Sequence, residues 1–189
     1  MLNTDLQVRI LELKRKYAIY ATWSHKNLFK TIIDEMAKPF QDKQIDKVLG
    51  LEARGFVLGA PLAYLLNCGF VVARKKGKMY ESYTDNDVYQ ETTVDYSGTT
   101  KTIEIEKHDK AIQPGDKVLI VDDWFETGGQ GHAAIKLIEK AGATVTGISI
   151  LLDDMNPEIR NSFSKYDLNA LVIKELFEKN AKNTYVLKK

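Results

Sequence analysis

The chain has 189 residues, 44% of them hydrophobic and 28% charged, which fits one soluble globular domain. With 27 basic and 26 acidic residues, the net charge of +1 argues against a general nucleic-acid binder. The single cysteine, Cys68, excludes an intrachain disulfide and a cysteine-based zinc site, and favours a reducing compartment. No window is apolar enough for a membrane span, and residues 1–16 lack the pattern of a signal peptide. We therefore expect a cytoplasmic protein without nucleic-acid or membrane partners.

The first part of the chain predicts helices followed by a strand–helix–strand unit. Apolar residues at helical spacing predict helices over residues 4–17 and 26–38, and Pro39 ends the second. A short apolar run, an apolar helix that stops at an Asn-Cys-Gly signal, and a second apolar run follow at residues 47–51, 55–66 and 70–73.

The stretch from residue 75 to residue 110 interrupts this alternation, because it is polar and rich in Tyr, Thr and Asp. Two alternating segments, near residues 89–96 and 100–106, predict a β-hairpin that turns around Ser97-Gly98. We expect this hairpin to be an exposed and flexible insertion over about residues 80–106.

The second half of the chain returns to strand–helix alternation. A continuous apolar run at residues 117–121 is typical of a central parallel strand, and the pattern continues with a helix, a strand and a last β-like run at residues 131–141, 144–152 and 169–173. A Lys-rich tail follows. This pattern predicts an α/β fold with an open, mainly parallel sheet and helices on both faces. We expect a single domain over residues 1–189, divided into an N-terminal helical segment, a core with the hairpin insertion, and a C-terminal segment at residues 1–45, 46–155 and 156–189.

The segment after the central strand carries the most informative chemistry. Asp122 and Asp123 follow the apolar run directly, and a Glu-Thr-Gly-Gly-Gln turn over residues 126–130 then leads into a helix. Open α/β sheets bind ligands at the carboxyl ends of their strands, where glycines and the N–H groups of a helix start can hold a phosphate. Adjacent carboxylates suit the vicinal hydroxyls of a sugar or a bound Mg²⁺. The alternative is a strand end and a turn without function.

This segment resembles the signature of the type I phosphoribosyltransferases, which is a hydrophobic strand, two acids, two or three variable residues and Thr-Gly. Within that family the chain is most similar to the adenine phosphoribosyltransferases over about residues 20–155, through segments at residues 51–56, 74–78, 95–96 and 103–107. The resemblance implies that the chain transfers the phosphoribosyl group of phosphoribosyl pyrophosphate (PRPP) to a base, with adenine favoured, in purine salvage. It also implies Mg²⁺ bound with PRPP, and we expect a homodimer.

The resemblance further implies a role for each matched residue. Asp122 and Asp123 would bind the ribose hydroxyls, and backbone amides would cradle the 5-phosphate at Glu126, Thr127, Gly128, Gly129 and Gln130. Cations and a tyrosine would hold pyrophosphate, namely Arg54, Arg74, Lys75, Lys78 and Tyr96. The hairpin would be a mobile hood that closes over the site to exclude water. The alternative for Arg54 is a surface arginine at a helix start. The alternative for the cations at residues 74–78 is a solvated basic turn.

The sequence departs from the family pattern mainly in the base-binding half. Glu126 stands where adenine enzymes usually have a small residue, Gln130 replaces a small hydroxyl residue, and Asp95 replaces a glutamate. Residues 19–27 lack the usual Phe-Arg-Asp run. Three flat aromatic side chains could stack on a base or pack in the core, namely Trp23, Trp124 and Phe125. For Phe125 we favour the core.

The catalytic candidates are Glu126 or Asp95 for the proton of the base, beside Asp122 and Asp123. A different base (a 6-oxopurine or orotate) is the alternative substrate, and a non-catalytic sensor of PRPP or nucleotide is the alternative class of protein. Pyrophosphate release with a panel of bases separates these possibilities. The histidines show no metal-ligand spacing, so we expect no metal site made by the protein alone.

Overall fold

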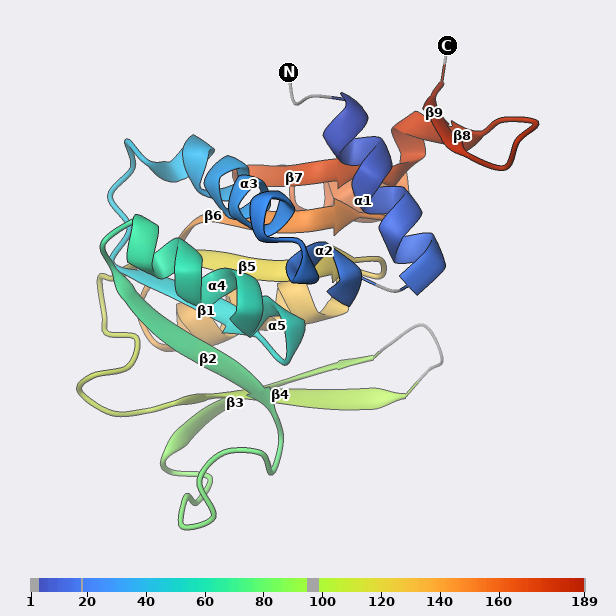
Figure 1. Ribbon diagram of the computed structural model, residues 1–189. Coiled ribbons are helices and arrows are strands. Elements are labelled where there is room, and N and C mark those ends of the chain that lie inside the picture. The colour runs from blue at the N-terminus through green and yellow to red at the C-terminus, as the bar shows by residue number, and fades with distance from the viewer. Residues whose placement is uncertain (1–3, 18, 95–98, 189) are drawn as a thin grey trace.

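A seven-stranded sheet forms the centre of the computed structural model, which describes residues 4–17, 19–94 and 99–188 (Figure 1). The strand order is β3-β4-β2-β1-β5-β6-β7. Five of these strands are parallel, namely β1 (Lys47–Leu51), β2 (Gly69–Lys75), β5 (Lys117–Phe125), β6 (Thr144–Asp153) and β7 (Leu168–Ile173). The predicted α/β fold with a mainly parallel sheet is confirmed.

Helices cover both faces of the sheet, as predicted. One face carries α1 (Thr4–Tyr17), α2 (Tyr20–Ser24), α3 (Lys26–Ala37), which runs into a 3-10 turn at Lys38–Phe40, and α4 (Arg54–Leu65). The other face carries α5 (Gly129–Lys140) and the short α6 (Pro157–Asn161). Alternate residues of β5 supply the two cores, since Leu119 and Val121 pack under the first set of helices and Val118 and Ile120 under the second.

The predicted hairpin consists of β3 (Val88–Val94) and β4 (Thr100–Glu106), paired antiparallel. It is not the exposed element that the sequence suggested, because β4 extends the main sheet by pairing with the end of β2. Ile103 and Ile105 are buried in the core that also contains the apolar residues of α5, so this face of β4 is covered. Its turn, with Asp95, Tyr96 and Ser97-Gly98, lies outside the described residues.

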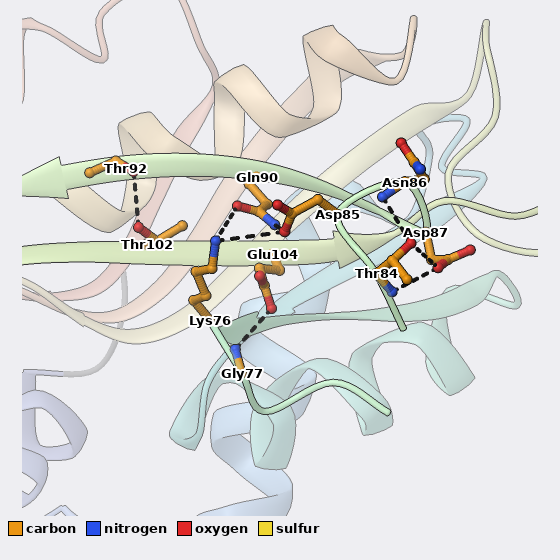
Figure 2. A network of polar contacts seen from close by, with 10 residues as sticks. All are labelled: Lys76, Gly77, Thr84, Asp85, Asn86, Asp87, Gln90, Thr92, Thr102 and Glu104. Carbon is orange, nitrogen blue, oxygen red and sulfur yellow. Dashed lines mark hydrogen bonds and ion pairs between the residues drawn. The ribbon is translucent and has the colours of Figure 1, made fainter. Parts of the chain in front are cut away.

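Polar contacts fasten the hairpin to the loop that follows β2 (Figure 2). Lys76 Nζ donates a hydrogen bond to Gln90 Oε1 at 3.0 Å and lies 3.7 Å from Asp85 Oδ1. The backbone N–H of Gly77 donates to Oε2 of the buried Glu104 at 3.2 Å. Lys76, one of the cations in the segment at residues 74–78, therefore binds the hairpin.

Strand β5 is longer than predicted. It runs to Phe125, whereas the apolar run ends at Val121. Beyond Val121 it pairs only with β6, because β1 stops at that level. Asp122 and Asp123 therefore lie within a strand end that projects past its neighbour β1, at the carboxyl edge of the sheet.

The C-terminal tail is folded, although the sequence indicated only a charged tail. After a 3-10 turn at Lys174–Leu176, strands β8 (Phe177–Lys179) and β9 (Tyr185–Leu187) form a small antiparallel hairpin beside α1. The backbone N–H of Tyr185 donates to Glu12 Oε1 at 2.8 Å. Within the described residues, every helix is too short or too polar to cross a membrane.

Candidate active site

The two acids at the end of β5 are buried side by side. Asp122 is 5% and Asp123 2% exposed, and Asp122 Oδ1 accepts a hydrogen bond from the backbone N–H of Asp123 at 2.8 Å. Burial, and then the neighbouring Asp123 carboxylate, raise the pKa of Asp122 well above its ordinary value. Burial also raises the pKa of Asp123, against the opposing effect of Arg54. Two desolvated carboxylates in this position favour a ligand that donates hydrogen bonds, such as a sugar diol.

Arg54, the first residue of α4, pairs with the second of these acids. Its Nε lies 3.1 Å from Asp123 Oδ2. The helix can approach β5 this closely only because the next residue is Gly55: a Cβ there would lie 2.7 Å from the Val121 carbonyl oxygen and 3.1 Å from Asp122 Oδ1. The Glu52–Ala53 peptide bond just before Arg54 is cis. The close approach that Gly55 allows brings Arg54 of the Leu51–Phe56 segment to the carboxylates, although the two lie far apart in the sequence.

The loop over residues 126–130 connects the end of β5 to the first turn of α5. Gly128 caps the helix with a φ of 69°, in the left-handed region that favours glycine. The first turn of a helix leaves N–H groups without intrahelical acceptors, and its dipole favours an anion. The loop lines a cavity of about 280 Å³, whose other walls are Arg54, Thr93, Val94, Lys101, Trp124 and Phe125.

The hairpin covers this loop at close range. A Cβ on Gly129 would lie 2.5 Å from Thr93 Oγ1 and 3.4 Å from the Val94 carbonyl oxygen. Lys101 of β4 lines the cavity from the same side. The hairpin therefore lies where a hood over the site is expected. Whether it moves stays a prediction.

A second cavity, of about 360 Å³, adjoins the first. It shares Arg54, Lys101, Trp124 and Gln130 with it, and its remaining walls are Tyr20, Glu52, Ala53, Lys75, Asp122 and Asp123. Both acids line this cavity together with three cations, Arg54, Lys75 and Lys101, so the adjoining cavities bring anion-binding and hydroxyl-binding groups to one edge of the sheet.

The residues predicted to bind pyrophosphate are only partly brought together. Lys75 lines the second cavity, and its backbone N–H donates to Glu52 Oε2 at 2.7 Å. Arg74 Nη2 lies 3.6 Å from Glu52 Oε1, so Glu52 holds the end of β2 against the loop before α4. Lys78 is exposed and lines neither cavity. Tyr96 lies outside the described residues.

The three aromatic candidates have different environments. Trp124 lines both cavities. Trp23 packs against the first core, with its ring centroid 5.0 Å from that of Tyr20, which itself lines the second cavity. Phe125 is buried and its ring packs against Phe163, as expected of a core residue. Glu126 is exposed and lines the first cavity.

Sequence reasoning missed several residues at the site, because no local pattern marks them. Lys101 and Thr93 come from the hairpin and Tyr20 from α2. Lys14 of α1 places its Nζ 3.3 Å from the ring centroid of Trp124. Burial lowers the pKa of Lys14, although nearby carboxylates, Asp154 first, oppose the shift.

Comparisons with known proteins agree with this geometry. The family model "Phosphoribosyl transferase domain" matches residues 23–185. The adenine phosphoribosyltransferase of Roseobacter denitrificans is 44% identical over 145 residues, which are 76% of this chain and 78% of that relative. The crystal structure of adenine phosphoribosyltransferase from Rhodothermus marinus superposes with a TM-score of 0.71 at 37% identity, covering 82% of this chain and 84% of the other. The Giardia lamblia enzyme complexed with 9-deazaadenine also gives a TM-score of 0.71, at 30% identity with the same coverage of each chain.

Proposed function

Because the chain belongs to the phosphoribosyltransferase family, and is thus an enzyme that transfers a phosphoribosyl group, we propose that its acceptor is adenine. The products would be AMP and pyrophosphate, in a purine-salvage reaction. The observation that carries the proposal is the pair of adjoining cavities, in which the buried Asp122 and Asp123 lie between a helix-start loop and Arg54. The relatives named as adenine phosphoribosyltransferases, one of them bound to 9-deazaadenine, support adenine as the base.

PRPP would bind along the carboxyl edge of the sheet. The backbone amides over residues 126–130 would hold the 5-phosphate, favoured by the start of α5. Asp122 and Asp123 would accept hydrogen bonds from the ribose 2- and 3-hydroxyls. Because both carboxylates are buried from water, they need such donors. These contacts would fix the ribose with C1 open to attack by the base.

Pyrophosphate would leave toward the second cavity. Arg54 and Lys75 line that cavity, and their positive charge would stabilise the negative charge that develops on the leaving group. Lys101 lines the same space and adds a third cation from the hairpin. Arg74, Lys78 and Tyr96 remain part of the proposed pyrophosphate set.

Mg²⁺ would enter with PRPP. No group of three or more acidic, histidine or cysteine side chains within the described chain is arranged to hold a metal ion. Asp122 and Asp123 do supply the hard oxygen ligands that suit Mg²⁺ when most of its ligands are phosphate oxygens and water. When bound, the ion would neutralise charge on the diphosphate.

The base would bind beside Trp124, which lines both cavities. We propose that Glu126 accepts the proton that adenine loses as its ring nitrogen bonds to C1 and the bond to pyrophosphate breaks. The exposed position of Glu126 on the wall of the first cavity supports this role. Asp95 remains the second candidate for the same proton.

Pyrophosphate release tests the proposed function directly. Purified protein with PRPP and Mg²⁺ would be given adenine, hypoxanthine, guanine, xanthine and orotate in separate reactions. We expect release with adenine far above the others, and formation of AMP. Faster release with another base would overturn the assignment of adenine, whereas binding of PRPP without turnover of any base would mean that the chain has lost the activity of its family.

A homodimer and a cytoplasmic location complete the proposal. Apolar side chains lie exposed on α4 and the neighbouring β2, with Tyr64 85% exposed beside Val57, Leu65 and Phe70. A second copy of the chain would bury this surface. Light scattering after size exclusion should give twice the monomer mass for the wild type, and Tyr64→Glu should shift the mass toward that of a monomer. A monomeric wild type at micromolar concentration would refute the dimer.

A further inference from the structure

Helix α1 precedes the residues that match the family, which begin at residue 23. It is nevertheless firmly attached. Ile10 and Leu11 are buried in the first core, and Gln7 Nε2 donates to the Leu171 carbonyl oxygen at 2.8 Å. The bond from Tyr185 N–H to Glu12 ties the same helix to the C-terminal hairpin. A side chain carried by α1 therefore has a fixed place relative to the sheet.

One side chain of α1 reaches the active site. The Lys14 ammonium lies 3.3 Å from the centroid of the Trp124 ring, a distance that fits a cation–π contact. Its side chain is only 21% exposed. The nearest carboxylate is Asp154 Oδ2 at 4.0 Å, which is beyond hydrogen-bond distance, and that carboxylate already pairs with Lys174 Nζ at 2.6 Å. The Trp124 ring therefore lies closer to the ammonium than the Asp154 carboxylate does.

Trp124 is the ring best placed to meet the base. It follows Asp123 directly in β5 and lines both cavities. A base joined to C1 of a ribose held by Asp122 and Asp123 would lie within these adjoining cavities, whose shared wall includes Trp124. Lys14 Nζ lies over the ring of Trp124, and the same residue lines both cavities.

We propose that Lys14 is a positioning residue that holds the Trp124 ring as the surface against which the base packs, and so sets the affinity for the base. This inference rests on the proposed function, because it concerns the base end of the same site. It assigns a role to a helix outside the family match, in a chain that lacks the family's usual base-contact run at residues 19–27. The N-terminal helix would thus supply part of the base site.

A double-mutant cycle tests the inference through steady-state kinetics. Lys14→Met keeps the length of the side chain but removes its charge, and should raise KM for adenine by about 2- to 30-fold with KM for PRPP unchanged. Lys14→Arg keeps a cation and should restore most of the affinity. Arg9→Met, on the exposed side of the same helix, is the matched control and should leave both KM values unchanged.

The partner half of the cycle is Trp124→Leu. In this background Lys14→Met should have no further effect on KM for adenine, because the ring through which Lys14 acts is gone. An unchanged KM for adenine in Lys14→Met alone would overturn the inference. So would a loss of the same size in the Trp124→Leu background, which would mean that Lys14 contacts the base directly or supports the fold.

Tryptophan emission separates failure of this inference from failure of the proposed function. The Trp124 contribution is the difference between two emission spectra, one with Trp124 and one with Trp124→Leu, taken in the same background. It needs no substrate. We expect Lys14→Met to change this contribution, while Arg9→Met leaves it as in the wild type. An unchanged contribution would refute the Lys14–Trp124 contact whichever base is used. If the wild type converts another base instead of adenine, the kinetic cycle is run with that base.

Discussion

Replacing Asp122 by asparagine should stabilise the protein while impairing catalysis. The folded state raises the pKa of this carboxyl, through burial first and the Asp123 charge second, so its charged form destabilises the fold. The amide oxygen of Asp122→Asn can still accept the bond from the Asp123 N–H, and its NH₂ group can donate to the Asp123 carboxylate. An incompletely compensated buried polar group costs about 1–3 kcal/mol, and more when charged. We therefore expect a gain of at least about 1 kcal/mol at pH 7.

The direction of the Asp122 pKa shift determines how this gain in stability depends on pH. Below the ordinary carboxyl value of 3.8, Asp122 is protonated in both the folded and the unfolded state, so the variant and the wild type should be equally stable. As the pH rises toward the raised folded-state pKa, only the wild type loses stability through ionisation of Asp122, and the difference in Tm should grow. For a chain of this size, about 1 kcal/mol corresponds to about 2–4 °C in Tm.

Thermal unfolding from about pH 3 to about pH 8, which spans the ordinary carboxyl pKa, and pyrophosphate release together form the assay. Loss of a charged hydrogen bond to a ribose hydroxyl, which contributes about 1.5–3 kcal/mol, should reduce turnover by roughly 10- to 150-fold. Asp109→Asn, at an exposed position, is the control and should change neither quantity. A variant that is less stable than the wild type at every pH, or that keeps full activity, would refute the reasoning.

Three further changes test other parts of the structure. Glu126→Gln should reduce turnover by about 10²–10⁴-fold with KM for PRPP unchanged if Glu126 accepts the proton of the base, whereas no effect would leave Asp95 as the candidate. Hydrogen exchange over residues 80–94 and 99–106 should slow when PRPP and Mg²⁺ are added, and protection that is already complete in the free protein would argue against a moving hood. Gly131→Ala would place a Cβ 2.6 Å from the buried Phe125 ring and should lower Tm. The free energy of unfolding, measured with denaturant, should fall by about 1–3 kcal/mol. An unchanged Tm would contradict such tight packing.

The sequence by itself determined the elements that depend on local periodicity. Strand, helix and hairpin form where the apolar run at residues 117–121, the helical pattern at residues 131–141 and the alternating residues of the hairpin predict them, because each pattern buries one face or both faces of a regular element. The helix begins slightly earlier than predicted, at Gly129. The family signature around Asp122 and Asp123 is local in the same sense. It placed the acids and the helix-start loop at the correct edge of the sheet.

Only the tertiary structure decided what surrounds that edge. The length of β5 beyond Val121 depends on β6 as its remaining partner, and the burial of the hairpin depends on β4 pairing with β2. Lys101 and Lys14 come from elements far from the signature, and nothing in their local sequence marks them. Their positions result from long-range packing, which joins side chains distant in the chain and leaves no periodic trace in the sequence.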